Sequence, residues 1–174
     1  MQINQYTNQQ GIGLIEVLIT ILIIAIGLLG LAGMQAQSIK STYQASQRSQ
    51  AIWLAQELVE RMRANPLGII NNAAGGYTKT NSFSCSSKPK NCNGRSASCT
   101  HNEIAQHDLW NIFCDEATNK EILANLTPTI TCAPTDCSPN ADITVTVEWE
   151  EASGKFSRQG NNNPRVELLV KIEG

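Results

Sequence analysis

Cysteines are the residues of this chain whose type and spacing point most directly to chemistry, and all six lie after position 84. A zinc site takes cysteine pairs about two to four residues apart, often with histidine, and only Cys132 and Cys137 come near that spacing. Disulfide bonds in an oxidising compartment account for the thiols better. Six thiols allow fifteen pairings, between which the sequence does not choose, although Cys132–Cys137 is the favoured local bridge. The six are Cys85, Cys92, Cys99, Cys114, Cys132 and Cys137.

Nothing in the sequence indicates a catalytic centre. His101 and His107 are too far apart to share one helix face. Cys114 has two acidic neighbours but no plausible base. Neither a G-x-S-x-G motif nor a glycine-rich phosphate loop occurs. We therefore expect no enzyme, no cofactor and no metal site.

Composition argues against a nucleic-acid-binding protein. The 174 residues carry a net charge of -2, with 16% charged and 5% aromatic residues. Direct binding would need a basic domain or aromatic platforms for the bases. Lys88, Lys90 and Arg95 form a small basic loop, which we interpret as solvated.

A long apolar run near the N-terminus is a candidate membrane anchor for the rest of the chain. Residues 12–34 contain one charge, at Glu16, and are long enough to cross a bilayer as a helix. A secretory signal peptide would have a basic start, a shorter apolar stretch and a small-residue cleavage site. Here the start has no basic residue, the apolar stretch is longer and no clear cleavage site follows it. The positive-inside rule favours a cytoplasmic location for the side that carries Lys40 and Arg48. The cysteines favour the opposite orientation, which we adopt.

The start of the chain resembles the class III signal of type IV pilins and pseudopilins. A polar leader ends in Gly11, and Ile12-Gly13-Leu14-Ile15-Glu16-Val17 leads into the apolar run. The resemblance implies that prepilin peptidase cuts between Gly11 and Ile12 and that the new N-terminus at Ile12 is methylated. It also implies that Glu16 pairs with the freed amine of a neighbouring subunit during assembly. Ile12 and Gly13 replace the customary Phe and Thr, and the leader lacks basic residues.

The helix is predicted to continue beyond the membrane. Residues 35–65 contain neither Gly nor Pro, and an apolar stripe recurs at helical spacing through Ile52, Ala55, Val59 and Met62. Pro66 ends the helix. One helix over residues 12–65 would be roughly 80 Å long, with a transmembrane half (12–34) and an amphipathic half (35–65).

Residues 49–66 (SQAIWLAQELVERMRANP) narrow the resemblance to the PilV family of type IV pilus modification proteins. Asp108-Leu109-Trp110 and the stretch from Thr144 to Trp149 resemble that family too. We interpret Trp53 as part of the core face of the helix, together with the apolar stripe.

Residues 66–174 are expected to form a disulfide-containing α+β head, with a small antiparallel sheet on the amphipathic helix half. Leu67–Lys90 is predicted to be a loop. His101–Leu126 is predicted to be one or two short helices, broken near residues 117–119. Strands are predicted at Thr129–Cys132, Asp142–Glu150 and Arg165–Ile172, with a turn through Pro134 and Pro139 after the first.

The resulting hypothesis is a minor pilin whose leader, residues 1–11, is removed. It would sit in the inner membrane with a periplasmic head and then enter a pilus, at its tip or base. Its expected partners are prepilin peptidase, the assembly platform, the major pilin and other minor pilins, in a complex that primes or caps the filament. Motility, adhesion and DNA uptake would be consequences. The alternatives are a minor pseudopilin of a type II secretion system and a membrane-tethered adhesin or binding module.

Overall fold

The computed structural model describes residues 13–70, 76–78, 84–94, 96–114, 123–133, 137, 141–150 and 163–171. The chain divides into two compact units, Met1–Gln44 and Ala45–Gly174. Helix α1 begins in the first unit and ends in the second. All the other helices and strands described belong to the second unit, the head.

Helix α1 (Leu14–Ala64) is continuous over 51 residues, as the absence of helix breakers after position 34 predicts. At its C-terminal end the Asn65 N–H approaches the Arg61 and Met62 carbonyls, both at 3.1 Å. Pro66 follows, and because it lacks an N–H the helix cannot continue. Arg61 and Arg63 lie in the last turn, where positive charge is favoured by the helix dipole. The long helix expected from the sequence is confirmed.

Two shorter helices follow among the described residues. Helix α2 (Leu67–Ile70) lies within a segment predicted to be a loop, so that prediction was wrong for these four residues. Residues 76–78 and 84–90 contain neither helix nor strand, as predicted. Helix α3 (His101–Phe113) ends before Leu126, which was predicted to be helical and lies in a strand instead. The predicted break near residues 117–119 lies outside the described residues.

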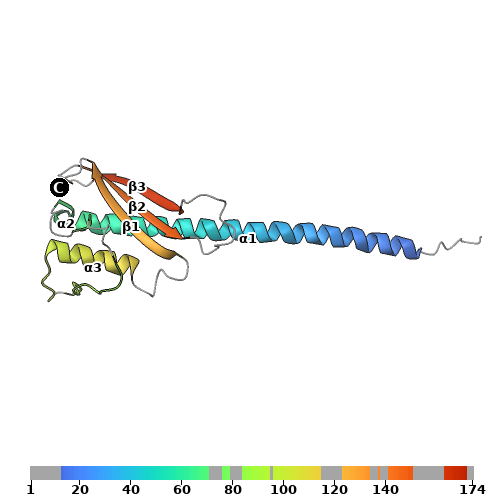
Figure 1. The fold of residues 1–174 in the computed structure, drawn as a ribbon, viewed down its shortest axis with the longest axis horizontal. Helices are drawn as coiled ribbons and strands as arrows, with labels where there is room; N and C mark the ends of the chain where they lie inside the picture. The colour runs from blue at the N-terminus through green and yellow to red at the C-terminus, as the bar shows by residue number, and fades with distance from the viewer. Residues whose placement is uncertain are drawn as a thin grey trace, which may run out of the picture. The chain divides into compact units, whose positions relative to one another are not determined.

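The head contains one antiparallel sheet of three described strands in the order β1-β2-β3 (Figure 1). They are β1 (Ala124–Ala133), β2 (Asp142–Glu150) and β3 (Arg165–Lys171). Val145 of β2 lies opposite Ile130 of β1 on one side and Leu168 of β3 on the other. The predicted β2 is confirmed, and β1 extends five residues further towards the N-terminus than the sequence indicated. The predicted turn at Pro134 and Pro139 and the predicted strand end at Ile172 lie outside the described residues.

The core of the head is built by the C-terminal part of α1, helix α3 and one face of the sheet. From α1, Ala55, Val59 and Met62 are buried, as the stripe predicts, and Ile52 is half-buried. Trp53 is 69% exposed, so its assignment to the core face was wrong. The alternating burial of β2 points Val145 and Val147 into this core. The α+β architecture is therefore the one expected from the sequence.

Candidate functional site

Glu16 lies in the first turn of α1, and its backbone N–H donates to the Gly13 carbonyl at 2.9 Å. Its side chain is exposed. The free N–H groups of a helix start favour a nearby carboxylate. The first turn therefore holds a negative charge at the edge of an apolar surface. Gly11 and Ile12, the predicted processing residues, lie outside the described residues.

The apolar part of α1 is exposed along its length. Every residue from Leu14 to Ile39 is exposed, with Leu29 at 74%. This is one helix that, by length and composition, could cross a membrane. Such a large apolar surface needs lipid or other helices around it. A Cβ added at Gly27, Gly30 or Gly33 would meet nothing within 4 Å.

A buried polar cluster joins the end of α1 to α3. Asp108 of α3 accepts a hydrogen bond from Tyr77 Oη at 2.5 Å and is paired with Arg61 Nη1 of α1 at 2.9 Å. Asp108 is 9% exposed and Tyr77 is fully buried. Burial, followed by the bond to Asp108, raises the pKa of Tyr77 well above its ordinary value, so the phenol stays protonated. Arg61 also binds Glu57, one turn earlier in α1.

Arg61 remains fully charged in this cluster. Burial by itself would lower the pKa of Arg61, but the hydrogen bonds and charges of Asp108 and Glu57 outweigh burial and raise it. The guanidinium therefore supplies the positive charge that a buried Asp108 carboxylate requires.

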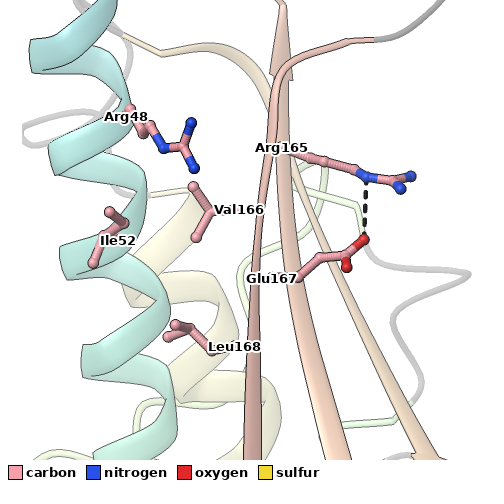
Figure 2. A pocket seen from close by; sticks show the side chains of 6 residues that line it. All are labelled: Arg48, Ile52, Arg165, Val166, Glu167 and Leu168. Atoms are coloured by element: carbon pink, nitrogen blue, oxygen red, sulfur yellow. Dashed lines mark ion pairs between the residues drawn. The ribbon is translucent and has the colours of Figure 1, made fainter.

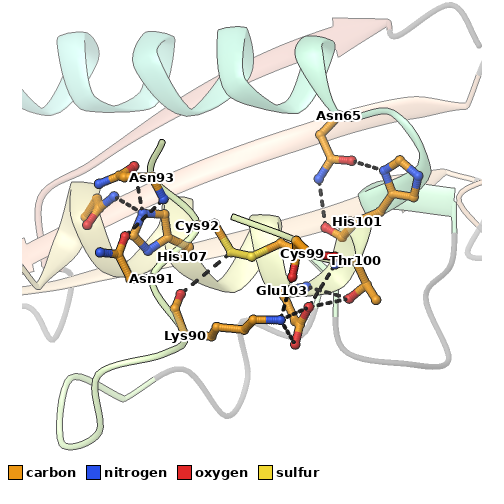
Figure 3. Close-up of a disulfide and its surroundings, with 12 residues drawn as sticks. Asn65, Lys90, Asn91, Cys92, Asn93, Cys99, Thr100, His101, Glu103 and His107 are labelled. Carbon is orange, nitrogen blue, oxygen red and sulfur yellow. Dashed lines mark hydrogen bonds and ion pairs between the residues drawn. A yellow bond between two sulfur atoms is a disulfide. The ribbon is translucent and has the colours of Figure 1, made fainter. Parts of the chain in front are cut away.

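A second set of bonds fixes the residue that ends α1. Asn65 Nδ2 donates to the His101 carbonyl at 2.8 Å, and Asn65 Oδ1 lies 2.8 Å from His101 Nδ1 (Figure 3). His101 is therefore a structural contact of Asn65. These two contacts of Asn65 attach the end of α1 to the start of α3.

Two glycines permit the backbone approach beside this junction. The Tyr77 N–H donates to the Gly68 carbonyl at 3.0 Å. A Cβ at Gly76 would lie 1.8 Å from the Gly68 oxygen, and a Cβ at Gly68 would lie 2.6 Å from Asn65 Nδ2. Glycine is required at position 76, where the clash would be with backbone, whereas at Gly68 the Asn65 side chain would have to move.

The six cysteines form three disulfides: Cys85–Cys114, Cys92–Cys99 and Cys132–Cys137. The local bridge favoured by the sequence is present. Cys85–Cys114 ties the segment before α3 to the end of that helix. Among the described residues, no group of three or more His, Cys, Asp or Glu side chains could hold a metal ion.

The segment from residue 84 to 100 is fixed to α3 by its side chains as well. Thr100 caps α3 in a capping box with Glu103, and Lys90 Nζ lies 3.1 Å from Glu103 Oε2 (Figure 3). The bond from the Thr100 N–H, followed by the one from Lys90, lowers the pKa of Glu103. Lys88 lies 4.6 Å from the centre of the Trp110 ring. Both lysines are exposed, as the interpretation of a solvated loop predicts, although each also contacts α3. Arg95 lies outside the described residues.

His107 is buried in α3 and has no catalytic partner among the described residues. Its Nε2 lies 3.1 Å from Asn93 Oδ1 and 3.0 Å from Asn111 Nδ2. Neither these contacts nor the burial of Tyr77 could be predicted from a sequence pattern. The sequence motifs RMRANP (Arg61–Pro66) and DLW (Asp108–Trp110) contain Arg61, Asn65 and Asp108, and they were the only indication that these residues matter.

Two protein-family models match parts of this chain. Residues 33–110 match the family described as type IV pilin Tt1218, and residues 6–32 match the prokaryotic N-terminal methylation motif. No curated protein and no solved structure gives a significant match. The first match covers the whole amphipathic half of α1, helix α2 and α3 up to Trp110. The second covers residues 6–11 of the leader, Glu16 and most of the apolar run.

Proposed function

Because the chain is a type IV pilin with a prepilin N-methylation motif, and so a membrane-anchored pilus or pseudopilus component, we propose that it is a minor pilin of the PilV type. Pilins of this kind are structural proteins, processed by prepilin peptidase and assembled with other pilins. In our proposal residues 1–11 are the leader and Ile12 becomes the methylated N-terminus. The head would join other minor pilins in a complex that primes or caps the filament.

The observation that supports this proposal most is the exposed first part of α1 with Glu16 in its first turn. Its apolar side chains are exposed on every side of the helix, from 47% at Val17 to 80% at Leu14. A bilayer can cover such a surface before assembly, and neighbouring helices can cover it afterwards. A carboxylate carried from lipid into a helix bundle needs a cation, which the freed amine of a neighbour would supply.

N-terminal mass spectrometry of the protein from membranes and from sheared surface filaments tests the processing step. We expect a methylated terminus at Ile12 in both fractions. Retention of Met1 would refute processing and would favour a tethered binding module. Recovery from filaments in far fewer copies than the major subunit is expected for a minor pilin. A secretion defect without any change in surface filaments would instead assign the chain to a type II pseudopilus.

The role of the acid is tested by Glu16→Leu, with Ile15→Leu as the matched control. Both substitutions introduce leucine, a good helix former, into the first turn, but only the first removes the carboxylate. We expect Glu16→Leu to reach the membrane and be lost from filaments, whereas Ile15→Leu is incorporated like the parent. Equal incorporation of the two variants would refute the proposed charge pairing.

A further inference from the structure

Two disulfides of the head are nested along the chain. Cys92 is bridged to Cys99, and the bridge between Cys85 and Cys114 encloses that pair. Four cysteines can pair in three ways. One alternative pairs neighbours in the sequence, as Cys85–Cys92 together with Cys99–Cys114, whereas the remaining one closes only longer loops. The sequential pairing is therefore the main competitor of the native one.

Loop closure by itself does not choose between these two pairings. Cys92 lies seven residues from Cys85 on one side and seven residues from Cys99 on the other. Because the entropy of closing a flexible loop depends on its length, the two bridges form with similar ease in an unfolded chain. Oxidation before folding therefore yields a mixture, in which a large share of the chains carries the non-native Cys85–Cys92 bridge.

Helix α3 separates the two ends at which the native bridges lie. It contains 13 residues and is about 20 Å long, with Cys99 just before its cap and Cys114 as its C-terminal cap. A disulfide needs its two Cα atoms within about 7 Å. Once α3 is helical, Cys99 and Cys114 cannot pair, which excludes the second bridge of the sequential pairing. The capping box of Thr100 and Glu103 gives this helix a local start beside Cys99.

The folded head also brings Cys92 to Cys99. Lys90 Nζ donates to the Ser98 carbonyl at 2.6 Å and is paired with Glu103 of α3 (Figure 3). These contacts hold the chain on both sides of the bridge at the start of the helix. The Cα atoms of Cys92 and Cys99 are 6.0 Å apart.

Cys85 is held at the opposite end of α3, where its Cα atom lies 5.3 Å from that of Cys114. A Cys85–Cys92 bridge would have to join the two ends of the helix, so it is incompatible with the folded head. A chain that folds around this bridge keeps Cys99 and Cys114 as thiols, because α3 prevents them from pairing with each other.

We propose that the native bridges are reached by exchange within the chain, and that α3 directs this exchange. In a chain that carries Cys85–Cys92, the Cys99 thiolate attacks Cys92 Sγ, the bond to Cys85 breaks and Cys85 leaves as a thiolate. This step forms one disulfide and breaks one, so it needs no oxidant. Cys85 and Cys114 are then joined by a thiol oxidant, which takes up their two electrons and two protons. The chain therefore requires a thiol oxidant but no separate disulfide isomerase.

The exchange step is tested with the Cys114→Ser variant, in which Cys92 can pair with Cys85 or with Cys99. The full-length chain is oxidised in urea and detergent, freed of oxidant and small thiols, and diluted into detergent buffer without urea. Mass spectrometry of alkylated digests follows each bridge. In urea we expect the two bridges in amounts within about threefold of each other. After dilution, Cys92–Cys99 should exceed Cys85–Cys92 at least about tenfold, at a rate independent of protein concentration.

The role of α3 is tested in the chain with all six cysteines, refolded with oxidised glutathione. Thr100→Ala removes the helix cap and should raise the yield of Cys99–Cys114 about fivefold over that of the parent. The matched control is Glu167→Gln, which removes the exposed ion pair of Glu167 with Arg165 on β3 (Figure 2). This control should give the parent's yield, because β3 contains no cysteine.

Three results would overturn the inference. They are a bridge ratio that stays within threefold after dilution, a conversion rate that rises with protein concentration, and equal yields of Cys99–Cys114 in Thr100→Ala and Glu167→Gln. The Thr100→Ala measurement keeps every native cysteine, so it decides the role of α3 even when Cys114→Ser does not fold. The inference concerns the head alone, so it applies to a pilus and to a pseudopilus component alike.

Discussion

Tyr77→Phe should destabilise the head by removing one hydroxyl from the cluster that joins α1 to α3. The Tyr77 hydroxyl lies 2.5 Å from Asp108 Oδ2, in a site where the tyrosine is fully buried. A hydrogen bond to a charged group contributes about 1.5–3 kcal/mol. Arg61 still holds the other carboxylate oxygen of Asp108, so the loss should not exceed that range. For a unit of this size the midpoint of thermal unfolding falls by about 4 °C per kcal/mol.

We therefore expect the thermal midpoint of Tyr77→Phe to fall by about 6–12 °C, measured by near-ultraviolet circular dichroism of the full chain in detergent. The control is Glu60→Gln, which removes an ion pair between the exposed side chains of Glu60 and Arg63. Such pairs contribute about 0–1 kcal/mol. The reasoning is refuted when Tyr77→Phe and Glu60→Gln lower the midpoint equally.

An alkaline titration gives an independent readout of the same site. Burial and Asp108 raise the pKa of Tyr77, so the folded chain keeps a proton that the unfolded chain loses near pH 10. The stability from this group is fully present below pH 10 and is lost as the pH rises further. Tyr77→Phe should remove this loss. An identical alkaline decline in the variant and the parent would contradict the geometry.

Three further outcomes are expected from the same measurement. Replacing Cys85 and Cys114 by Ser should cost about 3–4 kcal/mol, because the bridge closes a loop with a sequence separation of 29; unchanged stability would argue against the bridge. The pKa of Glu103 is lowered by its partners, so its contribution is present above pH 4.5 and is lost as the pH falls through the lower folded value. Glu103→Gln should flatten this acid dependence, and a profile like the parent's would contradict it. Gly76→Ala should unfold the head or displace its neighbours, because its Cβ would lie 1.8 Å from the Gly68 oxygen; a normal midpoint would refute this contact.

The candidate assembly segment could be predicted from the sequence because its signals are local. A run of apolar residues with Glu16 near its start defines a membrane-competent helix whatever its surroundings. Pro66 ends that helix through its own covalent geometry. The alternation in β2 likewise follows from which residues can line one face of a strand.

Tertiary structure alone decided the contacts that join distant parts of the chain. The Arg61–Asp108 pair spans 47 positions, and no periodicity indicates that Tyr77 lies between the two elements. Trp53 is exposed although its neighbours in the stripe are buried, because helix rotation is set by what packs against the helix. Six cysteines permit many bridges, and only the fold brings particular pairs together. Local chemistry fixed most of the elements of this protein, while their packing determined which side chains meet.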